Sequence, residues 1–234
     1  ADCYLAGVST RRMDKLVKTL GIDSLSKSQV SRMAQDLDEQ VAAFRHRRLD
    51  EAVQRRVEFL TGYQNAAYAR QYRAFVDRVR AAEAPLGSTR LTEAVARYLF
   101  KLMAYKDEYE VARLHLASAA AVAAEFEGDA RISFHLAPPV LPGRDPDGRP
   151  RKREFGAWMV PVFRVLAGMK RLRGSVLDPF GWLPERRAER AAIAEYEADM
   201  RRWLPTVTPA NLALVRELAE LPLTVRGYGP VKED

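Results

Sequence analysis

The stretch HLAPPVLPGRDPDGRPRKREFGAWM, residues 135–159, lies between two long helical patterns and determines how the chain can be organised. It contains prolines at positions 138, 139, 142, 146 and 150. Because proline fixes φ and removes a backbone donor, no regular element is expected to run through this stretch. We therefore predict an extended surface connector that the flanking helices hold in place.

The connector also carries a basic run. Its cationic residues are Arg149, Arg151, Lys152 and Arg153. The acidic residues near them are Asp145, Asp147 and Glu154. A cationic and partly rigid loop of this kind either binds an anion or remains solvated, and composition leaves both interpretations open.

Apolar residues recur at helical spacing on both sides of the connector. The helical patterns cover residues 53–79, 91–114, 116–126, 158–172 and 185–204. Pro85 and Gly87 break the first pattern, and Thr208 followed by Pro209 predicts the start of a last helix. Residues 131–136 alternate enough for a short strand. The predicted fold class is mainly α, a helical module with a proline-rich basic connector and at most a short strand pair.

Residues 9–44 predict two helices joined by a turn at Gly21, which resembles a helix-turn-helix. Ser26 and Gln29 form a capping box that opens the second helix. In a helix-turn-helix, the start of the second helix enters the major groove of DNA. The residues expected to contact DNA are therefore Lys27, Ser28, Gln29, Ser31 and Arg32. Any two amphipathic helices with a glycine turn give a similar pattern, so a pair that only packs remains an alternative.

Charge and cysteine content limit the possible classes of protein. The chain has 38 basic and 31 acidic residues, and its net charge of +7 permits anionic partners without requiring them. Cys3 is the single cysteine, which excludes a disulfide framework and a cysteine-ligated zinc or iron–sulfur site within this chain. No apolar run is long enough to span a membrane. We therefore expect a cytoplasmic protein.

Conventional catalytic signatures are absent from the sequence. It contains no glycine-rich phosphate loop, no H-E-x-x-H and no G-x-S-x-G. His115 and His135 have no cysteine or nearby histidine partner in the sequence, so we expect hydrogen-bonded structural histidines and no metal site. No catalytic residue is predicted, and whether the chain is an enzyme stays open.

The first 50 residues contain the motifs GVSTR, SKSQVSR and LDEQVAAFRHR. Residues 4–50 resemble the segment that precedes the catalytic domain in mutator-type insertion-sequence transposases. Such enzymes cut and join DNA with an acidic triad that binds divalent metal. The similarity ends near Asp50, before the first catalytic aspartate of that family is expected. The resemblance therefore implies a DNA-binding helical fragment without strand-transfer chemistry.

The remaining motifs are RRVEFLTGYQNAAYARQYRAFVDRVRAAE, LTEAVARYLFKLMAYKDEYEVARLH, FHLAPPVL, GRPRKREFGAWM, LRGSVLDPFG, AERAAIAEYE and VRGYGPVKE. They resemble the C-terminal region of the large indolepyruvate ferredoxin oxidoreductases. Such enzymes oxidatively decarboxylate aryl 2-oxoacids with thiamine diphosphate, iron–sulfur clusters, coenzyme A and ferredoxin. The parts that bind thiamine and the clusters lie upstream in that family and are missing here. Tyr228-Gly-Pro230 also departs from the family's usual Phe-Gly-His.

The two resemblances meet at Leu49-Asp50-Glu51 and predict two domains. Residues 1–49 are expected to be a transposase-like helix-turn-helix fragment, and residues 50–234 a helical C-terminal domain like that of the oxidoreductase. The predicted function is a piece of a 2-oxoacid ferredoxin oxidoreductase that is inactive alone and binds no cofactor itself. Other oxidoreductase domains or ferredoxin are the expected partners. The alternative is a DNA-binding transposase remnant that uses residues 9–44.

Overall fold

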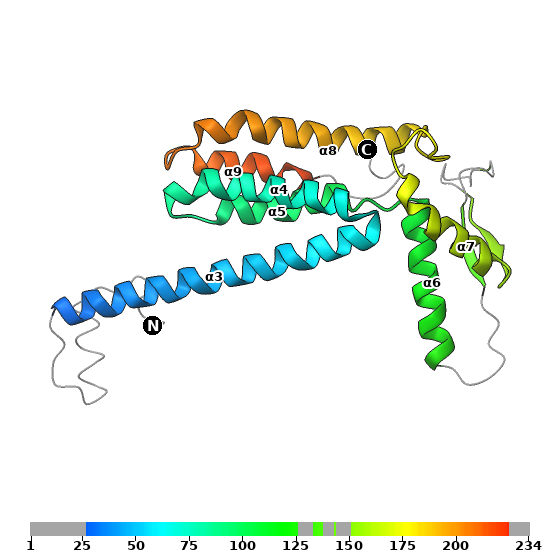
Figure 1. Cartoon of the computed structure of the whole chain (residues 1–234), viewed down its shortest axis with the longest axis horizontal. Coiled ribbons are helices and arrows are strands. Elements are labelled where there is room, and N and C mark those ends of the chain that lie inside the picture. The colour runs from blue at the N-terminus through cyan, green and yellow to red at the C-terminus, as the bar shows by residue number, and fades with distance from the viewer. Residues whose placement is uncertain (1–26, 126–132, 138–142, 144–150, 225–234) are drawn as a thin grey trace. The chain divides into compact units, whose positions relative to one another are not determined.

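Helices make up most of the computed structural model, which describes residues 27–125, 133–137, 143 and 151–224 (Figure 1). Within these residues it contains seven α-helices and one two-stranded sheet, so the predicted mainly α class is confirmed. The first helix of the predicted N-terminal pair and Ser26 lie outside the described residues. The chain divides into two units, 1–54 and 55–234.

Helix α3, Lys27–Tyr63, is one helix of 37 residues. Lys27 is the first residue that the structure describes, so the predicted capping box at Ser26 stays a prediction. Our expectation that this helix ends by residue 44 and that another begins near residue 51 was wrong. The sequence has neither glycine nor proline from residue 27 to residue 61, so nothing in the backbone chemistry interrupts the helix. The predicted domain boundary at residues 49 and 50 falls inside α3 and stays a prediction.

The second unit contains a bundle of four helices that lie along one another (Figure 1). They are α4 (Ala66–Glu83), α5 (Arg90–Met103), α8 (Pro184–Trp203) and α9 (Leu212–Glu220). Apolar side chains at helical spacing point inward from each helix. The buried ones include Tyr72, Val76, Val79, Leu91, Val95, Leu99, Ile193, Met200 and Val215. Burial of this stripe is the main stabilising term of the bundle.

The connection between α4 and α5 combines a predicted break with an unpredicted cap. A short 3-10 helix, Ala84–Leu86, follows α4, and Gly87 adopts a left-handed conformation with φ of 62°. The buried Glu83 carboxylate accepts hydrogen bonds from the backbone N–H groups of Leu91 and Thr92, at 2.9 and 2.8 Å. It therefore occupies the N-terminus of α5, where backbone donors have no partners within the helix.

Helix α6, Glu108–Glu125, is separate from α5, so the predicted continuous helix through Leu114 was wrong. The chain leaves helical geometry between Ala104 and Asp107. Asp107 then accepts a hydrogen bond from the backbone N–H of Glu110 at 2.9 Å and caps the new helix. The alanine-rich run is helical as far as Glu125, as predicted.

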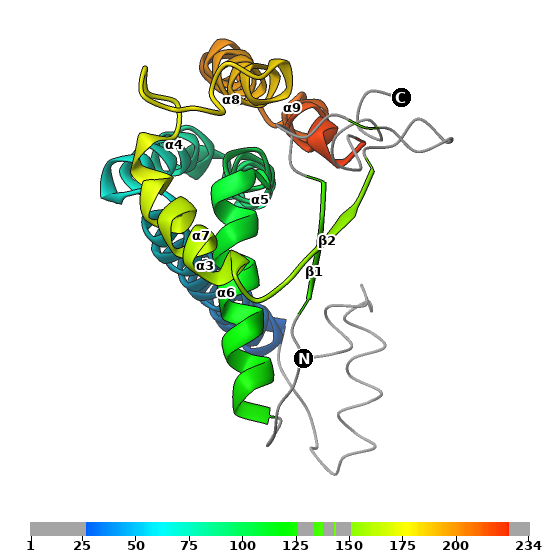
Figure 2. The ribbon, with the colours of Figure 1, turned by 90° about the vertical axis from the view of Figure 1, so that its right-hand side faces the viewer.

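A second packed layer joins α6 to α7, Met159–Gly168 (Figure 2). Strands β1 (Phe134–Leu136) and β2 (Arg153–Phe155) pair antiparallel, with Phe134 opposite Phe155. The core of this layer consists of Ala112, Phe134, Met159 and Phe163. The imidazole of His115 stacks on the ring of Phe163 with 5.1 Å between centroids. The predicted strand pair is therefore present, and most of the connector between its strands lies outside the described residues.

The C-terminal part of the second unit follows the predicted breaks with one exception. Helix α7 continues into a 3-10 turn, Met169–Leu172, and Gly174 follows with φ of 74°. Helix α8 begins at Pro184, one residue before the predicted pattern of 185–204. The predicted helix start at Thr208 was wrong, because α9 begins at Leu212. The Asn211 side chain accepts from the Thr208 N–H at 2.7 Å and holds the chain in a turn before the helix.

Short 3-10 helices follow α8 and α9, at Leu204–Thr206 and Leu221–Leu223. Each contains a proline, which cannot continue an α-helix hydrogen-bond ladder. None of the helices in the described part of the chain is long and apolar enough to cross a membrane.

Candidate functional site

Exposed side chains line the part of α3 that lies in the first unit. Of the residues predicted to contact DNA, Ser31 and Arg32 are exposed. The side chains of Lys27, Ser28 and Gln29 lie outside the described residues. Two further cations, Arg47 and Arg48, are also exposed, and the Arg48 guanidinium lies 5.7 Å from the ring centroid of Phe44. Sequence reasoning did not single out these two arginines, although Arg47 ends the LDEQVAAFRHR motif and Arg48 follows it.

The basic run of the connector is only partly described. Arg151, Lys152 and Arg153 are exposed, and Arg149 lies outside the described residues. The backbone N–H of Arg151 donates to the carbonyl of Gly143 at 3.0 Å, and Arg153 begins strand β2. The predicted anion site at this run stays a prediction.

A buried ion pair joins the start of α6 to the segment after α7. The Arg173 Nε lies 2.5 Å from Asp107 Oδ2, and Arg173 Nη2 lies 2.8 Å from Asp107 Oδ1. Their side chains are 3% and 2% exposed. Such a two-point contact fixes orientation as well as charge. Burial alone would lower the pKa of Arg173, but hydrogen bonding to Asp107 outweighs it and raises the pKa, so the guanidinium is charged at neutral pH.

Tyrosines enclose this ion pair. The guanidinium of Arg173 lies 3.6 Å from the ring centroid of Tyr63, and its Nη1 donates to the Tyr63 carbonyl at 2.6 Å. The Tyr63 hydroxyl in turn donates to the carbonyl of Tyr105 at 2.7 Å. A cation held against an aromatic face in a dry site is well stabilised. The ion pair and its contacts with Tyr63 therefore hold the end of α3 next to the start of α6 within the second unit.

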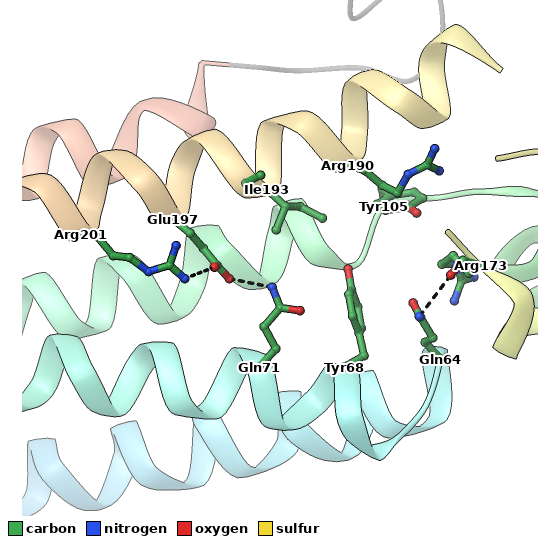
Figure 3. Close-up of a pocket in the computed structure, with 10 residues that line it drawn as sticks. Gln64, Tyr68, Gln71, Tyr105, Arg173, Arg190, Ile193, Glu197 and Arg201 are labelled. Atoms are coloured by element: carbon green, nitrogen blue, oxygen red, sulfur yellow. Dashed lines mark hydrogen bonds and ion pairs between the residues drawn. The ribbon is translucent and has the colours of Figure 1, made fainter. Parts of the chain in front are cut away.

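A pocket of 280 Å³ lies beside the buried pair, between α4 and α8 (Figure 3). We call it the α4–α8 pocket. Its lining residues are Gln64, Tyr68, Gln71, Tyr105, Arg173, Arg190, Ile193, Ala194, Glu197 and Arg201. Tyr68 and Ile193 point into the space between the two helices (Figure 3). The pocket therefore combines apolar walls with three guanidinium groups and one carboxylate.

Polar side chains close one end of the α4–α8 pocket. Buried Glu197 accepts a hydrogen bond from Gln71 at 3.0 Å and one from Arg201 at 2.6 Å (Figure 3). At the other end the Gln64 amide donates to the Arg173 carbonyl at 3.4 Å. The charges of Glu197 and Arg201 thus compensate each other, as those of Asp107 and Arg173 do.

Arg190 and Tyr105 lack such compensation. Arg190 Nη2 donates to the Gly181 carbonyl at 2.5 Å, whereas its buried Nη1 has no hydrogen-bond partner among the described residues. Within the same residues the Tyr105 hydroxyl makes no hydrogen bond either. Burial, followed by the negative charge of Asp107, raises the pKa of Tyr105 to about 12, so this hydroxyl is protonated at neutral pH. Both residues line the pocket, and the guanidinium of Arg190 is directed toward Gly181.

These residues were missed by sequence reasoning. Arg190 and Glu197 belong to a helix rich in arginine and glutamate, and such charges are typical of a solvated face. Their roles depend on contact partners that are distant in sequence, and no local sequence pattern identifies such partners. Among the residues that the structure describes, no three histidine, cysteine, aspartate or glutamate side chains gather as metal ligands would.

The fold and these sites define a mainly helical protein whose second unit contains a buried arginine–aspartate ion pair and a small polar pocket. The chain belongs to the family of unknown function DUF6537, which matches residues 49–234. Residues 1–57 match a second family, the Mutator family of transposases. The two matches overlap within α3. No solved structure is significantly similar to the chain.

Two curated relatives share the N-terminal segment. They are the transposases for insertion sequence element IS1081 of Mycobacterium tuberculosis and Mycobacterium bovis, each 70% identical over 50 residues. The aligned segment covers 21% of this chain and 12% of either relative. The N-terminal resemblance to a transposase fragment is therefore confirmed, whereas the resemblance of residues 50–234 to the oxidoreductase stays a prediction.

Proposed function

We propose that the N-terminal segment is a DNA-binding remnant of a Mutator-family transposase, without that enzyme's cutting and joining activity. The match over residues 1–57 and the identity to the IS1081 transposases carry the proposal. The chain spans 12% of the length of those relatives, so their whole activity is not transferred. Binding to the phosphate backbone requires only exposed cations at suitable spacing.

The described part of α3 offers such cations. Arg32 and Arg47 stand 15 positions apart, which corresponds to about 22 Å along a helix axis and a rotation of about 60°. Both are exposed, and Arg48 adds a charge next to Arg47. One side of the helix can therefore contact the phosphates of one duplex at two places. Residues 1–49 contain nine basic and six acidic residues, a surplus of three charges, so the binding is expected to be weak.

Paired charge substitutions test this proposal. Full-length protein with Arg32→Gln and Arg47→Gln should bind labelled duplex DNA more weakly in fluorescence anisotropy, by at least about tenfold for two lost phosphate contacts. The control is Arg70→Gln with Arg90→Gln, which removes the same charge from exposed positions in the second unit. Equal losses in the two variants would show attraction by net charge alone and would refute binding through α3.

We propose as a second function that residues 50–234 act as a non-catalytic module of a 2-oxoacid ferredoxin oxidoreductase, docking on its cofactor-binding parts. The observation that carries this proposal is the exposure of large apolar side chains on the segment that contains the motif LRGSVLDPFG. Val176, Leu177 and Trp182 are 83%, 72% and 72% exposed there. Large apolar side chains gathered on one exposed segment mark an interaction surface.

Asp178 holds this segment in a fixed conformation. Its carboxylate accepts from the Gly174 N–H at 2.7 Å, the Phe180 N–H at 3.1 Å and the Tyr109 hydroxyl at 2.7 Å. A fixed loop loses less conformational entropy when it binds a partner. We define residues 176–182 as the apolar loop. The buried network beneath it supports a docking role for the loop.

A reconstitution experiment tests the docking proposal. The purified chain should bind the upstream part of an indolepyruvate ferredoxin oxidoreductase whose own C-terminal region has been removed, as measured by calorimetry. Leu177→Asp should weaken the complex by at least about tenfold. The control Leu214→Asp changes another exposed leucine, on α9, and should leave the affinity unchanged. Absence of binding, or an equal effect of both variants, would refute docking through the apolar loop.

A further inference from the structure

Helix α7 is apolar on every side but buried on only one. Arg164 is the single polar side chain in its ten residues, MVPVFRVLAG. Met159 and Phe163 belong to the core that α7 shares with α6, and they are 8% and 3% exposed. A helix that is apolar all round is normally buried all round. One side of α7 therefore lacks the cover that its sequence calls for among the residues that the structure describes.

Three large side chains form this uncovered side. Trp158, Val162 and Val165 are 62%, 38% and 63% exposed. Trp158 precedes the helix with helical backbone angles, φ of −60° and ψ of −14°. At about 100° per residue, the three positions lie within about 60° of one another round the helix axis. We call these three residues the α7 stripe. Its spacing of i, i+4 and i+7 is the pattern that one helix presents to another.

Strand β2 holds the start of the α7 stripe in place. The ring of Phe155 contacts the ring of Trp158 edge to face, with 5.9 Å between their centroids. The chain passes directly from β2 into α7, so the stripe begins beside the basic run of the connector (Figure 2). Because an ordered side chain loses less conformational entropy when it binds, this contact favours docking at Trp158.

The segment around the α7 stripe is strongly cationic. Residues 151–171 contain six basic residues and one acidic residue, Glu154. The exposed cations among them are Arg151, Lys152, Arg153, Arg164 and Arg171. A second copy of the chain would bring the same cations with it, whereas carboxylates on a partner would reduce the repulsion among them. The charge of this segment therefore selects an acidic partner over a second copy.

We propose that the α7 stripe docks an acidic amphipathic helix of a partner protein. Apolar residues of that helix cover Trp158, Val162 and Val165, and its carboxylates face Arg164 and the cations of residues 151–153. The stripe is separate from the DNA contact on α3 and from the apolar loop, so this inference goes beyond both proposed functions. It also gives the basic run a role in place of simple solvation.

A synthetic helix tests the proposal. The probe is a fluorescein-labelled peptide of about three heptads, with leucine at positions a and d and glutamate and alanine elsewhere. Its anisotropy with the full chain should show saturable binding with Kd below about 100 µM. The same peptide with lysine in place of glutamate should bind at least about tenfold more weakly. No saturable binding of the acidic peptide, or equal binding of the two peptides, would overturn the proposal.

Variants locate the binding on α7. Val165→Asp places a charge in the middle of the contact and should weaken binding of the acidic peptide at least about tenfold. The control Leu214→Asp adds the same charge at another exposed apolar residue, on α9, and should bind like the original chain. Equal losses in the two variants would show attraction by net charge alone and would overturn the proposal.

Arg164→Gln serves as a second variant that leaves the apolar surface intact. It should weaken binding several-fold, because a cation beside the stripe is lost. The control Arg70→Gln removes the same charge from an exposed position on α4 and should have no such effect. If Val165→Asp fails to fold, this comparison decides alone, and equal affinities of the two arginine variants would overturn the proposal.

An anionic membrane is the competing partner, because it also combines apolar and acidic groups. Cosedimentation with vesicles of phosphatidylcholine and phosphatidylserine distinguishes it from a helix. Val165→Asp should sediment with these vesicles to the same extent as Leu214→Asp, because the stripe does not insert into lipid. Selective loss of cosedimentation in Val165→Asp would identify the stripe as a membrane contact and would overturn the proposal.

Discussion

Arg173 and Asp107 form a two-point ion pair that is almost completely buried, with Nε–Oδ2 and Nη2–Oδ1 distances of 2.5 and 2.8 Å. The pair joins residues 66 positions apart, and it lies next to the α4–α8 pocket. Removing two charges from water is costly, and the tyrosine ring and carbonyl around Arg173 offset part of that cost. The pair therefore ties the α6–α7 layer to the end of α3 within the second unit.

Breaking this pair should be strongly destabilising. Asp107→Asn keeps an acceptor for the α6 cap but leaves Arg173 buried without a counter-charge, so we expect a loss of about 3–5 kcal/mol in the free energy of unfolding. Urea unfolding measures it. Asp77→Asn, which breaks the exposed pair of Arg73 and Asp77 on α4, should cost less than about 1 kcal/mol.

A double variant tests whether the loss of stability comes from the unpaired buried charge. Adding Arg173→Met to Asp107→Asn removes the unpaired charge and should restore part of the lost stability. If Asp107→Asn alone lowers the free energy of unfolding no more than Asp77→Asn does, the buried ion pair does not stabilise the fold as we expect.

Glu83 should be required for the start of α5. Glu83→Ala leaves the N–H groups of Leu91 and Thr92 buried without an acceptor, so the free energy of unfolding should fall by about 2 kcal/mol or more. Chemical denaturation followed by circular dichroism measures the change. Glu195→Ala removes an exposed carboxylate from α8 and should cost less than about 0.5 kcal/mol. Similar costs for the two variants would argue against the capping role.

Asp178 should make stability depend on pH in acid. Burial alone would raise the pKa of Asp178, but hydrogen bonds from Gly174, Tyr109 and Phe180 outweigh it and lower the pKa. The native state therefore binds this proton less readily than the unfolded chain, and the stabilisation is complete above about pH 4. It is lost as the pH falls through the lowered native value. The unfolding free energy of the original chain should drop there, and that of Asp178→Asn should drop less.

Unfolding measured between pH 7 and pH 3 checks this prediction. Tyr109→Phe removes one donor to Asp178 and should shift the acid loss to higher pH. Parallel stability curves for the original chain and Asp178→Asn would contradict the assigned role.

Local chemistry made several elements of the fold predictable. The breaks at Gly87 and Gly174 and the start of α8 at Pro184 follow from backbone preferences that the residues carry with them. The end of α5 near Ala104 was not predictable in this way. It depends on Asp107, whose partner Arg173 is distant in sequence, and the apolar spacing continues across the break.

The residues of the pocket were even harder to predict from local sequence than the end of α5. Gln71 and Glu197, which close one end of it, are 126 positions apart. In the sequence, Arg190 cannot be distinguished from the other arginines of α8, because its contact with the Gly181 carbonyl exists only in the folded structure. Similarity to known families distinguished the two segments of the chain, and the described structure supplied the candidate pocket.

The salt dependence of DNA binding tests the central claim, that the N-terminal segment retains a transposase's contact with DNA. If Arg32 and Arg47 each contact a phosphate, log K against log salt should fall with a slope of about −1.8. Anisotropy of the full chain with a labelled duplex measures this slope. We predict a slope of at least that steepness, reduced in the Arg32→Gln and Arg47→Gln double variant. A flat dependence, or no binding at low salt, would contradict the claim.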